Sequence, residues 1–215
     1  GHAYDPADEH DACGVGLVAA LDGKPRREIV EMGIMALKNV WHRGAVDADG
    51  KTGDGAGIRV AVPQDFFREH VTRTGHTPTD DPICVGQIFL PRTDFAAQEA
   101  ARTIVETEVL HFGFYIYGWR QPPVDVSVIG QKAKDTRPAI EQIMFRDAQG
   151  RTPEDLERAL YISLSHASLI YKGMFLAQDI DNFYLDLRDT RFVSNFAIYH
   201  QRYSTNTFPQ WSLAQ

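Results

Sequence analysis

The 215-residue sequence has only two cysteines, Cys13 and Cys84, and neither belongs to a metal spacing such as C-x-x-C. Two cysteines are too few for a disulfide scaffold, and this scarcity fits a reducing compartment better than an oxidising one. No apolar run approaches the ~20 residues of a membrane-spanning helix, and the acidic, polar N-terminus lacks the features of a signal peptide. These absences predict a cytoplasmic protein that does not associate with membranes.

Basic residues are also scarce. The chain has 22 Lys and Arg against 29 Asp and Glu, a formal net charge of -7, and its basic residues are not clustered. This balance argues against nucleic acid and against anionic membranes as partners. The sequence does have 43% hydrophobic residues, which is enough for one sizeable core.

The two ends of the chain differ from its middle. Gly1-His2 reads as a scar of recombinant expression, and residues 3–12, with four acidic residues and one proline, read as an exposed leader. Residues 1–12 are therefore expected to lie outside a domain that spans residues 13–215. Residues 208–215 are aromatic and apolar where a polar tail is usual, so we expect this domain to be incomplete at its C-terminal end.

Hydrophobic periodicity predicts a mixture of helices and strands. Strands are expected where apolar residues alternate or run together between turn residues, at 14–21, 58–62, 83–90, 114–119, 140–146, 170–175 and 195–203. Helices are expected at 27–40, 64–72, 94–110, 152–166 and 181–187. Residues 124–129 fit a strand or a helical turn. The order of elements predicts an α+β domain in which helices cover a sheet.

Cys13 stands directly before the first expected strand. Small residues such as Gly14 and Gly16 on one face of that strand predict close cover on both faces, and they leave room for another group to approach the cysteine. A thiolate is a strong nucleophile, but a free cysteine has a pKa of about 8.5 and needs help from its surroundings. The alternative is a small buried hydrophobe at a strand end. Cys84, within a buried strand, is expected in the core.

Residues 41–58 hold five glycines and three aspartates in eighteen positions. A calcium loop fits poorly, because the Glu at its twelfth position and its flanking helices are missing. A phosphate-binding loop fits poorly too, since no Gly-Lys-Ser/Thr follows. Two interpretations remain: an ordered turn into the strand that starts at Ile58, or a loop whose N–H groups meet a small substrate together with Arg43. Arg43 could equally be a structural ion-pair partner.

Arg202 ends the last expected strand and is followed by the hydroxyl and amide side chains of residues 204–207. The planar guanidinium fork can bind both oxygens of a carboxylate. This turn is therefore a candidate clamp for a small carboxylate, and the alternative is an ion pair between Arg202 and a structural acid.

These three sites fall within motifs that resemble one known family. The motifs are Asp11-Ala12-Cys13-Gly14-Val15-Gly16, His42-Arg43-Gly44-Ala45, Gly53-Asp54-Gly55-Ala56-Gly57, Tyr171-Lys172-Gly173-Met174 and His200-Gln201-Arg202-Tyr203-Ser204-Thr205-Asn206-Thr207-Phe208-Pro209. Together they resemble the N-terminal amidotransferase domain of glutamate synthase large subunits, over residues 11–215. More broadly, they resemble the class II glutamine amidotransferases.

The resemblance implies an N-terminal nucleophile (Ntn) fold, a four-layer αββα sandwich. It implies that Cys13 becomes the mature N-terminus and attacks the side-chain amide of L-glutamine, with its own α-amino group as general base. An α-amine has a pKa of about 7.7 to 8, so it can accept a proton near neutrality. By the same resemblance, Arg202 and Thr205 hold the substrate carboxylate, and Asn206 and Arg43 complete the substrate-binding set.

The resemblance also implies partners. No cofactor is expected in this segment. In the full-length enzyme, ammonia passes to synthase domains of the same polypeptide, which use 2-oxoglutarate, FMN and an iron–sulfur cluster. Electrons come from reduced nicotinamide or ferredoxin, and a small electron-transfer subunit is a further expected partner.

Two features of the sequence depart from the family pattern. Residues 1–12 precede Cys13, so its nitrogen is an amide that cannot act as a base, and we expect no glutaminase activity while they remain. The family's Asn-Gly oxyanion motif lies beyond Gln215, and losing one oxyanion donor costs about a hundred- to a thousandfold in rate. The remaining alternatives are an Ntn cysteine hydrolase of another amide and a catalytically inactive scaffold domain.

Overall fold

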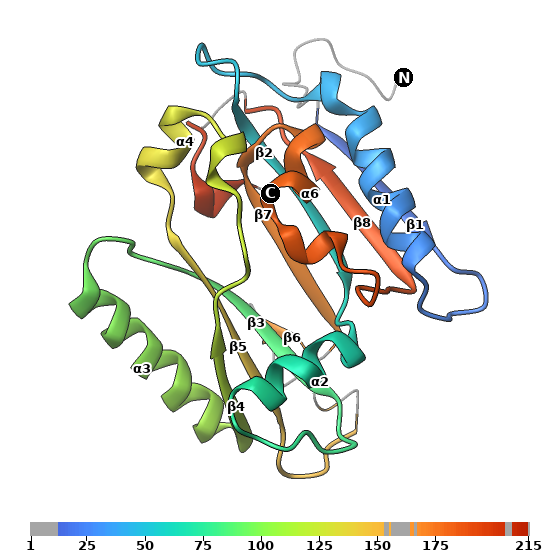
Figure 1. Cartoon of the computed structure of the whole chain (residues 1–215), viewed down its shortest axis with the longest axis vertical. Coiled ribbons are helices and arrows are strands. Elements are labelled where there is room, and N and C mark those ends of the chain that lie inside the picture. Colours follow the sequence, from blue (N-terminus) through green and yellow to red (C-terminus); the bar gives the residue numbers. More distant parts are fainter. Residues whose placement is uncertain (1–12, 153–154, 156–163, 166, 205–207, 215) are drawn as a thin grey trace, which may run out of the picture.

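The computed structural model describes residues 13–152, 155, 164–165, 167–204 and 208–214. These residues form two four-stranded antiparallel sheets with helices, which confirms an α+β arrangement (Figure 1). The first sheet has the order β1 (Gly14–Ala19), β8 (Phe196–Gln201), β2 (Thr52–Ala61) and β7 (Ser168–Phe175). The second has the order β4 (Phe114–Arg120), β5 (Ala139–Asp147), β3 (Ile83–Leu90) and β6 (Leu164–Ser165).

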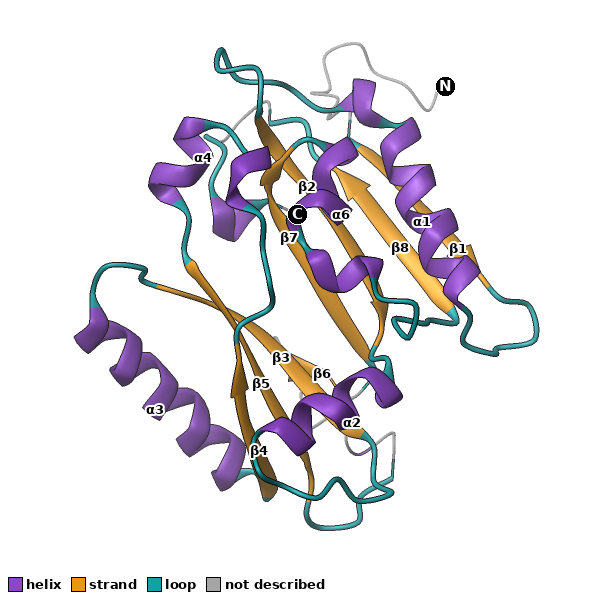
Figure 2. Cartoon of the chain, in the orientation of Figure 1, coloured by secondary structure: helices purple, strands orange, loops and turns teal. Residues whose placement is uncertain are grey.

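Helices connect these strands, and Figure 2 shows them beside the two separate groups of strands. The α-helices are α1 (Arg27–Asn39), α2 (Gln64–Arg73), α3 (Phe95–His111), α4 (Gln131–Thr136) and α6 (Ile180–Phe183). The 3₁₀ helices are η1 (Trp41–Arg43), η2 (Val126–Val128), η3 (Ala177–Asp179), η4 (Leu185–Arg188) and η5 (Trp211–Leu213).

Helix α1 covers one face of the first sheet, over β1 and β8 (Figure 1). Its buried stripe comprises Ile29, Val30, Gly33, Ile34 and Leu37, which recur at helical spacing. The helix approaches the sheet so closely that a Cβ at Gly33 would lie 2.5 Å from the Cβ of Ala197. Complete burial of an aliphatic side chain here contributes about 1.5–3 kcal/mol, so this stripe anchors the helix to the sheet.

The opposite face of β1 is uncovered among the described residues. Val15 and Leu17 are 68% and 63% exposed, so the expectation that β1 is covered on both faces is wrong. Among the described strands, β1 lies at the edge of its sheet and pairs with β8. Helix α1 takes the face of Gly14 and Gly16, and no described residue packs over the other.

A buried polar cluster joins the two sheets. Asp186 forms an ion pair with Arg120 of β4 at 2.8 Å and accepts a hydrogen bond from the Tyr171 hydroxyl of β7 at 2.7 Å. Gln142 of β5 also donates to that hydroxyl, at 3.2 Å. Burial first, and then the charge of Asp186, raise the pKa of Tyr171 well above its usual value, so its hydroxyl keeps its proton. These paired groups fix how the second sheet meets the first.

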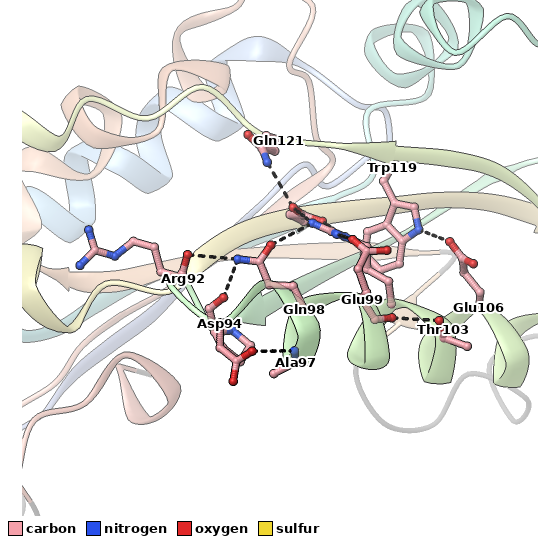
Figure 3. A network of polar contacts seen from close by, with 12 residues as sticks. Arg92, Asp94, Ala97, Gln98, Glu99, Thr103, Glu106, Trp119 and Gln121 are labelled. Carbon is pink, nitrogen blue, oxygen red and sulfur yellow. Dashed lines mark hydrogen bonds and ion pairs between the residues drawn. The ribbon is translucent and has the colours of Figure 1, made fainter.

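Helix α3 is attached by an apolar contact and by polar contacts. Val109, with Val105 beside it, packs in a small apolar cluster with residues of β3, β4 and β5, whereas Phe95 and Ile104 are 75% and 64% exposed. Figure 3 shows the contacts that hold the helix. Arg102 pairs with Glu141 of β5, with Nε to Oε2 at 2.8 Å, and Trp119 of β4 donates to Glu106 at 2.6 Å. On α1, Met32 is likewise exposed, at 51%.

The observed bounds of the other helices and strands agree with the predicted ones to different degrees. Strand β3 has the predicted bounds, α1, α2, α3, β4, β5 and β7 lie within two residues of theirs, and 124–129 contains the helical turn η2. Strand β2 begins at Thr52, six residues earlier than predicted, because its glycines admit neighbouring backbone: a Cβ at Gly53 would lie 2.5 Å from the Phe175 carbonyl oxygen. Most of the helix predicted at 152–166 lies outside the described residues, although Thr152 accepts from the Asp155 N–H at 3.3 Å as a helix cap does.

Candidate active site

Cys13 lies half-buried immediately before β1, opposite the end of β8. Its Sγ accepts a hydrogen bond from the Tyr203 N–H at 3.5 Å. A Cβ at the neighbouring Gly14 would lie 3.2 Å from Val40 and 3.3 Å from the Cβ of Arg43. The cysteine is therefore held between the end of α1, η1 and the residues that follow β8.

Arg43 ends η1 and is exposed, and Gly44 follows it. A Cβ at Gly44 would lie 2.1 Å from Nε2 of Gln201, so a glycine is needed here for packing against β8. Among the described residues, no carboxylate forms an ion pair with Arg43.

Gln201 ties the end of β8 to β2. Its buried Nε2 donates to the carbonyl oxygen of Gly55 at 3.0 Å, and the Arg202 N–H donates to the same oxygen at 2.9 Å. Gly55 has φ of +143°, and a Cβ there would lie 2.4 Å from the Ala214 carbonyl oxygen. Only glycine fits this backbone position, where three distant segments meet.

Asp54, which is 8% exposed, also links segments that are distant in the sequence. Its Oδ2 accepts from the Ser204 N–H at 2.7 Å, and its own N–H donates to the Ala45 carbonyl oxygen at 3.3 Å. We call the region where Cys13, Gly44, Asp54 and Gln201 meet the Cys13 end of the first sheet. Sequence reasoning did not single out Asp54 or Gln201, and the one signal for Asp54 was an acid inside a run of glycines.

Arg202 lies half-buried at this end, where its Nη1 donates to the Leu213 carbonyl oxygen of η5 at 2.6 Å. Of the five predicted site residues, the structure therefore brings together Cys13, Arg43 and Arg202. Thr205 and Asn206 lie outside the described residues.

His200 borders the same region, across from Val15 in the β1–β8 pairing. Burial, and then the charge of Arg202, lower the pKa of His200 from its usual value. His200 is therefore neutral at pH 7 and supplies no positive charge to a Cys13 thiolate.

Residues 47–52, within the glycine- and aspartate-rich stretch, form an ordered turn. Asp49 accepts hydrogen bonds from the Thr52 hydroxyl at 2.6 Å and from the N–H groups of Thr52 and Lys51, which hold its pKa well below the usual range. Asp47 forms an ion pair with Lys132 at 2.5 Å. No group of three His, Cys, Asp or Glu within the described part of the chain could hold a metal ion. In that same part, no helix is long and apolar enough to cross a membrane.

The sequence matches the family described as glutamine amidotransferases class-II over residues 13–163 and 162–215. It is 61% identical to the glutamate synthase [NADPH] large chain of Azospirillum brasilense, over all of this chain and 15% of that protein. It is 40% identical to the ferredoxin-dependent glutamate synthase of Spinacia oleracea, described as chloroplastic, over 96% of this chain and 14% of that protein. The chain thus spans about a seventh of the length of these relatives.

Proposed function

Since the chain belongs to the class-II glutamine amidotransferases, we propose that it hydrolyses L-glutamine to glutamate and ammonia as the glutaminase domain of a glutamate synthase large chain. The observation that carries the proposal is the position of Cys13. Cys13 is half-buried just before the first strand, and its Sγ accepts a hydrogen bond from the N–H of Tyr203, the residue after Arg202. A nucleophile and a group that can bind a carboxylate are therefore close together.

In the first step, the Cys13 thiolate attacks the amide carbon of glutamine. The C–N bond breaks, the nitrogen takes up a proton and ammonia leaves, so a glutamyl thioester remains. Water then cleaves the C–S bond, which releases glutamate and the thiol. The Tyr203 N–H already donates a hydrogen bond to Sγ, so the sulfur lies at a defined place beside the end of β8.

The base is the α-amino group that Cys13 acquires when residues 1–12 are removed. Its pKa of about 7.7 to 8 suits proton transfer near neutrality. Before removal, the same nitrogen belongs to a peptide bond and cannot accept a proton. The leader is thus proposed to keep the site silent until it is cleaved.

Substrate binding is assigned to Arg202, Thr205, Asn206 and Arg43. In the described structure Arg202 donates to a neutral carbonyl oxygen, that of Leu213. A substrate carboxylate is a stronger acceptor for a guanidinium, so exchanging one for the other is favourable. Glutamine would therefore draw Arg202 away from η5.

The finer fold assignment is the four-layer αββα sandwich of the Ntn enzymes, with a domain that starts at residue 13 and continues beyond residue 215. The uncovered apolar face of β1, where Val15 and Leu17 are 68% and 63% exposed, supports it. Further residues of the polypeptide would cover that face, and they would also supply the oxyanion donors.

For the whole polypeptide we propose glutamate synthesis from 2-oxoglutarate with the ammonia released here. The FMN, the iron–sulfur cluster and the contact with a small electron-transfer subunit belong to the rest of that polypeptide. Reduced nicotinamide or ferredoxin would be the electron donor, as the names of the relatives suggest for those proteins. A cytoplasmic location is proposed on the basis of the sequence composition.

The test compares two forms of the whole polypeptide, one whose intact mass shows residues 1–12 retained and one that begins at Cys13. Release of glutamate and ammonia from glutamine is expected only from the second form. Equal rates from both would refute the role of the α-amino group. No activity from either form would refute the glutaminase function.

A further inference from the structure

A cavity of about 700 Å³ opens where the end of β3, α4, the start of β5 and η5 meet. Figure 2 shows α4 above the ends of these strands. It is lined by Phe89, Leu90, Pro91, Arg92, Thr93, Lys132, Asp135, Thr136, Arg137, Pro138, Met174, Pro209, Gln210, Trp211 and Ser212. None of these residues takes part in the proposed hydrolysis of glutamine.

The wall of this basic cavity carries three cations and one acid, in a chain whose formal net charge is -7. The acid, Asp135, accepts a hydrogen bond from the Gln131 side chain at 2.7 Å. Lys132 is paired with Asp47, and the one hydrogen bond that Arg92 donates to a described residue goes to the backbone oxygen of Asp135, at 3.3 Å. The local charge is therefore positive and incompletely neutralised.

Arg137 shows most clearly that the positive charge of the cavity is not neutralised. Its guanidinium is half-buried, yet no described residue accepts a hydrogen bond from it or forms an ion pair with it. Burial, and then the positive charge of Arg92, lower the pKa of Arg137 below its usual value. A half-buried cation without a partner is destabilising, and an anion in the cavity would offset that cost.

Part of the remaining wall is apolar, beside the polar side chains of Thr93, Thr136, Gln210 and Ser212. The rings of Phe89 and Trp211 meet edge to face with centroids 6.1 Å apart, and Met174 lines the cavity beside them. The Trp211 ring is fixed because its Nε1 donates to the Ala133 carbonyl oxygen at 3.0 Å. This surface suits a hydrocarbon chain and is poorly suited to a fully hydrated ion.

We propose that the basic cavity binds a carboxylate carried on a short hydrocarbon stem, with Arg137 and Arg92 holding the carboxylate and the apolar wall holding the stem. Planar guanidinium groups match the two oxygens of a carboxylate. The ligand is either a free dicarboxylate or an Asp or Glu side chain from the remainder of the polypeptide, which in the relatives is several times longer than this chain.

The basic cavity and the Cys13 end are separate places, and η5 contacts both of them. Trp211 and Ser212 line the cavity, while the next residue, Leu213, accepts the hydrogen bond from Arg202. The proposal does not depend on glutaminase activity, and its test uses binding alone.

Isothermal titration calorimetry with glutarate, at low ionic strength, tests the proposal on the 215-residue chain and on the whole polypeptide. Saturable binding to the chain is expected, weakened about tenfold or more by Arg137→Gln because a charged hydrogen bond is lost. Arg137→Lys should fall between, since it keeps the charge and loses the fork. The control Arg73→Gln removes an equal charge from an exposed site on α2 and should leave the affinity unchanged.

The two sources of carboxylate give different results. Retained binding in the whole polypeptide supports a free dicarboxylate, whereas binding to the chain but not to the whole polypeptide supports an internal Asp or Glu that already fills the cavity. The proposal is overturned if glutarate binds neither form, if Arg137→Gln has no effect in a variant with unchanged thermal midpoint, or if inorganic phosphate binds as tightly as glutarate.

Discussion

The face of the first sheet that α1 covers and the Cys13 end of the same sheet are held by different forces. Under α1 the contacts are apolar, and Leu37 is completely buried. At the Cys13 end the ties are hydrogen bonds from Gln201 and Asp54 to backbone groups, together with glycines that admit neighbouring segments. The first region is built for stability, and the second positions groups with a defined geometry.

The comparison predicts that substitutions will divide into those that change activity and those that change stability. The two cysteines give the largest contrast. In the mature protein, Cys13→Ala should lower glutaminase activity by about 10⁴-fold or more, because the nucleophile is lost, with little change in stability. Glutamate release and urea unfolding measure the two effects.

Cys84→Ala is the matched control, since Cys84 is fully buried and burial raises the pKa of its thiol to about 12. It should cost about 1–2 kcal/mol of unfolding free energy and leave activity per folded molecule unchanged. A Cys13→Ala protein with normal activity would remove the distinction between the two regions.

Leu37→Ala tests the covered face. The side chain is 0% exposed, so its truncation should cost about 2–5 kcal/mol in urea unfolding. Met35→Ala, on the same helix but 62% exposed, should stay within about 0.5 kcal/mol. Similar losses for both variants would show that α1 does not anchor to the sheet through this stripe.

Gly55→Ala tests the geometry of the Cys13 end. Its positive φ and the 2.4 Å approach to the Ala214 oxygen should together cost about 2–4 kcal/mol and raise the KM for glutamine, since Arg202 is bound to this residue. Gly50→Ala is the control, because Gly50 has φ of +70° but no atom within 4 Å of its Cβ position. It should cost about 1 kcal/mol and leave KM unchanged. Steady-state kinetics and urea unfolding check both, and an unchanged KM in Gly55→Ala would contradict the geometric role.

Near neutral pH, the smallest effect on stability is expected from the buried histidines. Burial, and then the charge of Arg120, lower the pKa of His70 on α2 from 6.5 to about 4, so the folded state resists its protonation. Its contribution to stability is complete above pH 6.5 and is lost as the pH falls toward 4. His70→Gln should therefore reduce the slope of the unfolding free energy against pH in this window. The reduction corresponds to up to about one proton taken up on unfolding.

His200→Gln should flatten the same curve in the same direction, because burial lowers the pKa of His200 too. Urea unfolding at several pH values compares the two variants. An unchanged pH dependence in both variants would show that the burial of these imidazoles does not affect stability.

The local sequence pattern was sufficient to predict the bounds of most helices and strands, but not which of their faces are exposed. The bounds of β3 and the stripe of α1 follow from periodicity, which is a property of neighbouring residues. The exposure of Val15 does not, because whether anything packs over that face of β1 depends on segments far along the chain. The early start of β2 was missed for a similar reason, since its glycines are unfavourable in a strand until other backbone packs against them.

The candidate site divides in the same way. Cys13, Arg43 and Arg202 could be selected because their residue types carry chemistry and their motifs resemble a family. Asp54 and Gln201 were missed, because a buried acid or amide gains its role from a distant N–H or carbonyl group that no local pattern reveals. The cavity around Arg137 is likewise assembled from segments that are separate in sequence.

The pairing of β1 has a consequence for the order of events during synthesis. Gly14 lies opposite Gln201 in the antiparallel register, and β8 is the one strand among the described residues that pairs with β1. The ribosome adds about 5–20 residues per second, so the N-terminal strand waits many seconds for its partner. The residue proposed as the nucleophile is thus among the first made and among the last positioned. If cleavage after Ala12 requires the assembled strand pair, the appearance of a free α-amine at Cys13 would report that translation has passed β8 and that the sheet has closed.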